Sequence, residues 1–123
     1  PKKMKMTTQP ITIENGRVTI RPTSGGVWLT QHRIADLFGV FVSAVGANIR
    51  SIRKSGVLCE DATCRMKRYK DGSSVEVYSL EMIAALAFRL KSENAEIFRR
   101  WIIERATTPE VVWRMPTTNT SIN

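Results

Sequence analysis

Gly39 lies between two stretches of the chain that both carry the apolar spacing of an α-helix, and it constrains the fold more than any other residue. Residues 30–38 begin with a threonine suited to cap a helix, and apolar residues then recur at helical spacing. After the glycine, Val45, Ile49 and Ile52 repeat at the same spacing. Glycine tolerates the left-handed backbone that ends a helix. The pattern therefore predicts two short helices joined by a tight turn, which is the skeleton of a helix-turn-helix.

Two pairs of turn residues predict β-hairpins. Asn15-Gly16 divides residues 11–20, in which apolar and polar residues alternate on both sides of the turn. Asp71-Gly72 divides residues 65–78. Both pairs favour the left-handed backbone of a hairpin turn. We therefore expect one hairpin before the two helices and one after them.

The remaining pattern predicts an α+β domain. We expect a short strand over residues 27–29, a loop over residues 57–63, a third helix capped by Ser79, and a fourth helix from Glu93 to about Ala106. The apolar stripes of these two helices consist of Ile83, Leu86, Ala87 and Leu90, and of Ile97, Phe98, Trp101 and Ile102. The expected organisation is a basic N-terminal arm over residues 1–10, a winged-helix-like domain over residues 11–106, and an irregular tail over residues 107–123. That domain would contain the helix-turn-helix, the two β-hairpins and two C-terminal packing helices.

The charge of the chain is strongly positive and unevenly distributed. Nineteen Lys and Arg against eleven Asp and Glu give a net charge of +8, and residues 42–70 alone carry seven basic and two acidic side chains. A one-sided positive field attracts polyanions such as nucleic acid. The longest apolar stretches fall far short of the roughly 20 residues that span a bilayer, and no apolar run follows the basic start as in a secretory signal. We therefore expect a cytoplasmic protein with no membrane partner.

The residues that usually carry catalysis or bind metals are scarce. His32 is the single histidine, and no nucleophile motif accompanies it. Cys59 and Cys64 have no second Cys or His pair that would complete a four-ligand zinc site. We therefore expect no enzyme, no catalytic residue, no metal and no cofactor.

The face of the second helix that is opposite its apolar stripe is the predicted DNA-binding surface. That face carries Ser43, Ala47, Arg50, Ser51 and Lys54. The second hairpin would act as a wing whose basic side chains reach phosphates, namely Lys67, Arg68 and Lys70. Lys2, Lys3 and Lys5 of the arm would neutralise further phosphates. DNA is therefore the expected partner, and a transcriptional regulator is the expected role.

Two further interpretations stay open at the level of sequence. The same basic face could dock an acidic protein partner, with the helix-turn-helix serving only as a scaffold. A homodimer is also an open alternative, because one short helix reads few base pairs and two-fold symmetry doubles the site. Trp113 and its apolar neighbours in the tail would contribute to that contact.

Four segments occur in the order of conserved elements of a known family. The string Val27-Trp-Leu-Thr-Gln-His-Arg-Ile-Ala-Asp-Leu-Phe-Gly-Val40 resembles the opening of the RhuM-type virulence proteins of bacteria. Tyr78-Ser-Leu-Glu-Met-Ile83, Phe88-Arg-Leu-Lys-Ser92 and Phe98-Arg-Arg-Trp101 are similar to later elements of that family. The resemblance covers about residues 11–105. It implies a virulence-associated protein of a mobile element that binds DNA and has no defined enzymatic activity.

The chain departs from the family pattern at one position of the predicted interface. Family members usually have a serine directly after Gly-Val, where this chain has Phe41, and the next hydroxyl is that of Ser43. The departure predicts a shifted start of the second helix or an altered docking of that helix. Within the matching segments, Arg89 and Arg99 are expected to form structural salt bridges or to be surface charges, and Trp101 is expected in the core.

Overall fold

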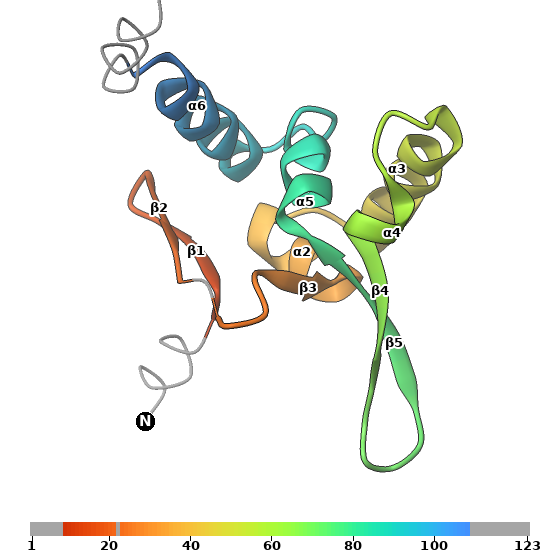
Figure 1. Ribbon diagram of the computed structural model, residues 1–123. Coiled ribbons are helices and arrows are strands. Elements are labelled where there is room, and N and C mark those ends of the chain that lie inside the picture. Colours follow the sequence, from red (N-terminus) through yellow and green to blue (C-terminus); the bar gives the residue numbers. More distant parts are fainter. Residues whose placement is uncertain (1–8, 22, 109–123) are drawn as a thin grey trace, which may run out of the picture.

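The computed structural model describes residues 9–21 and 23–108, which form an α+β fold (Figure 1). Its strands pair into two small antiparallel sheets, and its helices pack together beside them. The predicted arm residues Lys2, Lys3 and Lys5 and the predicted contact residue Trp113 lie outside the described residues. The elements in chain order are β1 (Ile11–Glu14), β2 (Arg17–Ile20), β3 (Trp28–Thr30), α2 (Gln31–Phe38), α3 (Val42–Ser55), α4 (Glu60–Thr63), β4 (Cys64–Arg68), β5 (Ser74–Ser79), α5 (Leu80–Ala87) and α6 (Glu93–Thr107).

Strands β1 and β2 form the first predicted hairpin. Ile11 pairs with Ile20, and Glu14 pairs with Arg17 next to the turn. Asn15 and Gly16 make that turn with φ angles of 54° and 73°, the left-handed backbone that this residue pair tolerates. Ile11 is buried in the core, so the hairpin is anchored to the body of the protein by its first residue.

Helices α2 and α3 confirm the predicted pair. The hydroxyl of Thr30 accepts a hydrogen bond from the Arg33 amide and caps α2, and Gly39 ends α2 in the left-handed conformation with φ 67°. The two helices are bent by 114° relative to one another across residues 39–41. Val45, Ile49 and Ile52 of α3 are buried as predicted.

The start of α3 is not displaced to the next hydroxyl. Phe41 occupies the N-cap position without a side-chain hydrogen bond, and α3 begins at Val42. The phenyl ring is left in solvent, since Phe41 is 82% exposed. Gln31 of α2 contacts this terminus, since its Nε2 donates to the Val42 carbonyl at 3.1 Å.

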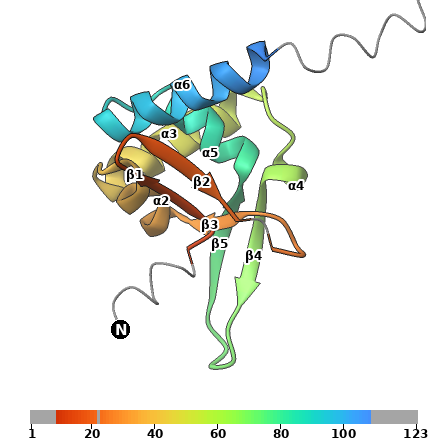
Figure 2. The ribbon, with the colours of Figure 1, turned by 90° about the vertical axis from the view of Figure 1, so that its left-hand side faces the viewer.

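Strands β3, β5 and β4 form the second sheet in that spatial order, and all pairs are antiparallel. Strands β4 and β5 are the second predicted hairpin, and both ribbon views show it projecting away from the helices (Figures 1 and 2). The expected loop over residues 57–63 is partly wrong, because residues 60–63 form the short helix α4. The Thr63 hydroxyl donates to the Cys59 carbonyl at 2.9 Å and is buried there. This side-chain bond supports a turn too short to show helical periodicity.

The core lies between the helices and one face of this sheet. Phe38 of α2 and Phe98 of α6 are fully buried and meet edge to face at 5.6 Å between ring centroids. The predicted stripe of α5 is buried as well, together with Met82. Trp101 is only partly buried, and it packs on Phe98 at the margin of the core. The contacts of these aromatic rings connect α6 to α2.

The predicted capping of the third helix is wrong in its chemistry. Ser79 stands at the N-cap position of α5, but its hydroxyl makes no capping bond. Its Oγ is buried and has no hydrogen-bond partner among the described residues. By contrast, the Ser92 hydroxyl accepts a hydrogen bond from the Ala95 amide and caps α6. Ser79 is the last residue of β5 and pairs with Trp28, and its side chain is therefore oriented by the sheet.

Candidate nucleic-acid interface

The solvent-facing side of α3 carries the residues that the sequence placed there. Ser43, Ala47, Arg50 and Lys54 are all exposed. No acidic residue occurs anywhere in α3, and within residues 9–21 and 23–108 neither Arg50 nor Lys54 makes an ion pair. The helix therefore presents two uncompensated cations on one exposed face. We refer to these four residues as the α3 face.

Ser51 lies at the edge of this face and is already engaged. Its hydroxyl accepts a hydrogen bond from Arg89 Nη1 at 2.8 Å. Arg89 is exposed, which fits the expected surface charge, and within the described residues it forms no salt bridge; its guanidinium joins the segment after α5 to α3. This bond orients Ser51 toward α5 and leaves the four residues of the α3 face as the open surface.

The basic residues of the second hairpin do not share one face. Side chains of a strand alternate between the two faces of a sheet. Glu76 lies on the same side as α3, because it pairs with Arg53 of that helix. Met66 is the partner of Glu76 in the register, so Arg68 is on the α3 side and Lys67 is on the opposite side. Lys70 belongs to the turn.

The turn of this hairpin is held by its own side chains. The Tyr69 amide donates to the Ser73 carbonyl at 2.8 Å. The Asp71 carboxylate accepts hydrogen bonds from the Ser73 hydroxyl at 2.6 Å and from the Ser73 amide at 2.9 Å. These two bonds, the hydroxyl first, lower the pKa of Asp71. At a pH above the pKa of this carboxylate, both hydrogen bonds therefore hold the turn that carries Lys70.

Sequence reasoning missed the residue that fixes the hairpin relative to α3. Arg53 forms one ion pair with Glu60 of α4 and a second one with Glu76 of β5, the latter at 3.2 Å. The bond to Glu60 is the main cause that raises the pKa of Arg53. Tyr78 also donates to Glu76 at 2.9 Å, and burial, followed by this bond, raises the pKa of Tyr78. Arg53 is therefore a structural cation, which no local sequence signal distinguishes from Arg50 or Lys54.

Gly46 has a packing role that the sequence did not reveal. It is buried in α3 where the start of α2 approaches. A Cβ atom at this position would lie 2.6 Å from Nε2 of Gln31, the same amide that donates to the Val42 carbonyl. The absence of a side chain at Gly46 thus leaves room for the Gln31 amide in its hydrogen-bonded position.

Arg99 is partly buried and forms no salt bridge within the described residues. Its Nη1 donates to the carbonyls of Ala87 at 2.6 Å and Leu90 at 3.0 Å, which belong to the end of α5 and the residues after it. The ion pair that does form in α6 joins Glu96 to Arg100 at 3.0 Å. Arg99 therefore binds the backbone at the end of α5 through its Nη1.

The described residues contain no group of three or more His, Cys, Asp or Glu side chains that could hold a metal ion. Cys59 is exposed, Cys64 is buried, and both are free thiols. No single helix in the described part is long and apolar enough to cross a membrane. Taken together, α2 and α3 would have the length and apolar composition of a membrane-spanning segment. In this fold their apolar side chains pack in the core.

Comparison of the chain with protein-family models, with curated proteins and with solved structures found no match.

Proposed function

We propose that this protein binds double-stranded DNA as a winged helix-turn-helix domain, with α3 as the recognition helix and β4–β5 as the wing. The observation that carries the proposal is the α3 face, an exposed and acid-free helix surface with Arg50 and Lys54 uncompensated. The angle of 114° between α2 and α3 lies within the range that helix-turn-helix units have. The strand order β3-β5-β4 around the two helices is also the order of winged-helix domains.

The chemistry of the α3 face suits a major groove. Arg50 has the planar donor group that reads guanine, while Lys54 is suited to a phosphate. Ala47 is small enough for the helix to approach the base edges, and Ser43 adds a hydroxyl that contacts either base or phosphate. Only Arg50 is a strong reader of base identity, so the proposed site discriminates modestly among sequences.

The wing contributes through Arg68 and Lys70 in this proposal. Arg68 is on the α3 side of the hairpin, and Lys70 is in the projecting turn. Both are exposed and form no ion pair within the described residues. Lysine and arginine contacts to phosphate fix the register of a protein on the duplex. The network around Arg53 keeps this wing at a fixed position beside α3. A transcriptional regulator is the role that we propose for such a domain.

The test measures binding to a random duplex of roughly 20 base pairs, a length that spans two major-groove half-sites. Arg50→Glu/Lys54→Glu reverses the charge of the α3 face, and Ala47→Glu blocks its centre. The matched control, Arg17→Glu/Arg105→Glu, makes the same change of charge on β2 and α6, which lie on the far side from α3 in Figure 1.

We expect binding by the parent protein and the control, and loss of binding in both α3 variants. Equal losses in the control and the α3 variants would refute a specific face. Failure of the folded parent protein to bind duplex at low salt would also refute DNA binding, and it would favour an acidic protein partner on the same face.

A further inference from the structure

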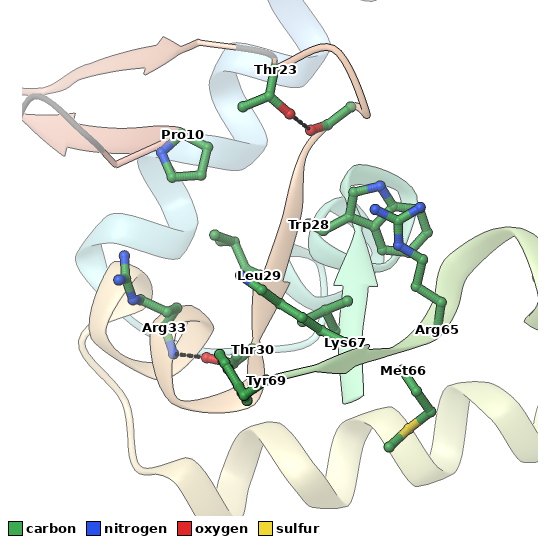
Figure 3. Close-up of a pocket in the computed structure, with 12 residues that line it drawn as sticks. Pro10, Thr23, Trp28, Leu29, Thr30, Arg33, Arg65, Met66, Lys67 and Tyr69 are labelled. Carbon is green, nitrogen blue, oxygen red and sulfur yellow. Dashed lines mark hydrogen bonds between the residues drawn. The ribbon is translucent and has the colours of Figure 1, made fainter. Parts of the chain in front are cut away.

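The second sheet has a hollow on the face turned away from α3 (Figure 3). Its volume is about 660 Å³. Because side chains alternate along a strand, some side chains of β3 and β4 lie together on the face of the sheet that is opposite the core. One residue of α2 and one residue after β4 also line this hollow. The residues that carry the argument are Trp28, Thr30, Arg33, Arg65, Lys67 and Tyr69. We refer to this site as the outer hollow.

The charge of the outer hollow is entirely positive. Arg33, Arg65 and Lys67 line it, and no acidic side chain does. All three are exposed and make no ion pair within the part of the chain that the structure describes. The Arg33 guanidinium instead donates to the side-chain oxygen of Gln9. Such a site favours an anionic ligand over any other.

The outer hollow also presents aromatic surface next to these cations. The Arg65 guanidinium lies over the Trp28 ring, 4.1 Å from its centroid. Lys67 Nζ lies 5.5 Å from the centroid of Tyr69, which is 45% exposed. Figure 3 shows the Trp28–Arg65 pair on one side of the hollow and Arg33 on the other. Aromatic and guanidinium planes interleaved with cations are the means by which proteins stack unpaired bases and hold their phosphates.

We propose that the outer hollow binds a short segment of single-stranded nucleic acid, with an unpaired base stacked on Tyr69 and the phosphates held by Arg33, Arg65 and Lys67. The bases of a duplex are stacked on one another, so their faces are not free to contact Tyr69. An unpaired base does have a free face, and it can stack on the exposed ring. The volume accommodates a few nucleotides rather than a long strand.

This site is independent of the proposed duplex-binding surface. Arg53 connects α3 to Glu76 on the core side of the sheet, whereas Lys67 and Tyr69 line the hollow on the other side. The proposal therefore goes beyond the proposed function and does not rest on it. Variants of the outer hollow and variants of the α3 face therefore test the two proposals separately.

The test measures the binding of fluorescent oligothymidine of about ten nucleotides, within the range of known single-strand sites. Tyr69→Ala removes the stacking surface, and Tyr69→Phe keeps it. The Tyr69 contact in the hairpin turn is made by backbone atoms, so both variants preserve that bond. Lys67→Ala tests the phosphate contact, and Arg17→Ala/Arg105→Ala, which changes exposed residues outside both proposed surfaces, serves as the control.

We expect Tyr69→Ala to weaken oligothymidine binding at least about fivefold, the smallest effect usual for one stacked base. Tyr69→Phe and the control Arg17→Ala/Arg105→Ala should bind as the parent protein does, and Lys67→Ala should bind more weakly. The proposal is overturned if the folded parent protein does not bind the oligonucleotide at low salt, or if Tyr69→Ala binds it normally. Equal displacement of the oligonucleotide by polyglutamate, which has charge but no bases, would also overturn it.

Discussion

The Gln31 amide packs on Gly46 where α2 and α3 meet, and a double-mutant cycle measures this contact. Replacing glycine by alanine inside a helix stabilises that helix by about 1 kcal/mol. Here the new methyl group would lie 2.6 Å from Nε2 of Gln31 and 3.4 Å from its Cδ, so the amide must move. It would then lose its hydrogen bond to the Val42 carbonyl, which is worth about 1 kcal/mol. We therefore expect Gly46→Ala to change the free energy of unfolding by less than about 0.5 kcal/mol.

The same substitution should behave differently once Gln31 is shortened. In a Gln31→Ala background no amide is displaced, and Gly46→Ala should stabilise the protein by about 1 kcal/mol. The coupling between the two positions is therefore about 1 kcal/mol. Urea unfolding followed by circular dichroism gives each value, provided that the m-value is unchanged.

Ser43→Ala is the matched control for this cycle, because Ser43 is exposed on the same helix. Its effect should be the same with and without Gln31→Ala. If Gly46→Ala had equal effects in both backgrounds, Gln31 would not pack on Gly46, and the reasoning would be refuted. A loss well above 1 kcal/mol in both backgrounds would show that backbone, not the flexible amide, limits the space.

Three further predictions concern single positions. Phe41→Ser should stabilise the protein by about 1 kcal/mol in urea unfolding, because a hydroxyl would cap α3 where the exposed phenyl group does not; no gain would show that the α3 terminus is satisfied otherwise. Arg99→Met should destabilise by about 2 kcal/mol, since the carbonyls at the end of α5 lose a charged donor; an unchanged unfolding midpoint would contradict those bonds. The Asp71 carboxyl should titrate below its ordinary pKa by NMR, because Ser73 donates two hydrogen bonds to it. Its stabilisation of the turn is then present above the ordinary pKa and is lost as the pH falls through the lowered one, and a normal titration midpoint would contradict this.

The local signals of the sequence predicted much of this fold. Asn15-Gly16 and Gly39 adopt the left-handed backbone that these residues tolerate, and they form the expected turns. The second hairpin is also present, but only Gly72 of its Asp71-Gly72 pair has a positive φ. Helix α4 was missed because a single turn of helix is too short to show periodicity. The predicted cap at Ser79 was wrong because a hydroxyl caps a helix only if its side chain points at the first amides. The direction of that side chain depends on tertiary contacts, which the local sequence does not show.

The partners of charged residues were harder to predict than the elements that carry them. Arg50, Arg53 and Lys54 are near neighbours in sequence, yet only Arg53 meets carboxylates from α4 and β5. That difference depends on contacts between distant segments. The opposite orientation of Lys67 and Arg68, by contrast, follows from strand alternation and was available from the sequence once the hairpin was predicted.

The salt dependence of duplex binding tests the central claim most directly. Each phosphate neutralised contributes about −0.9 to the slope of log affinity against log salt concentration. Because Lys54 is the proposed phosphate contact and Arg50 the proposed base contact, Arg50→Ala/Lys54→Ala should make the slope shallower by about 0.9. The control Arg17→Ala/Arg105→Ala removes the same charge elsewhere and should leave the slope unchanged. Equal slopes for the parent protein and the α3 variant would contradict DNA binding by the α3 face.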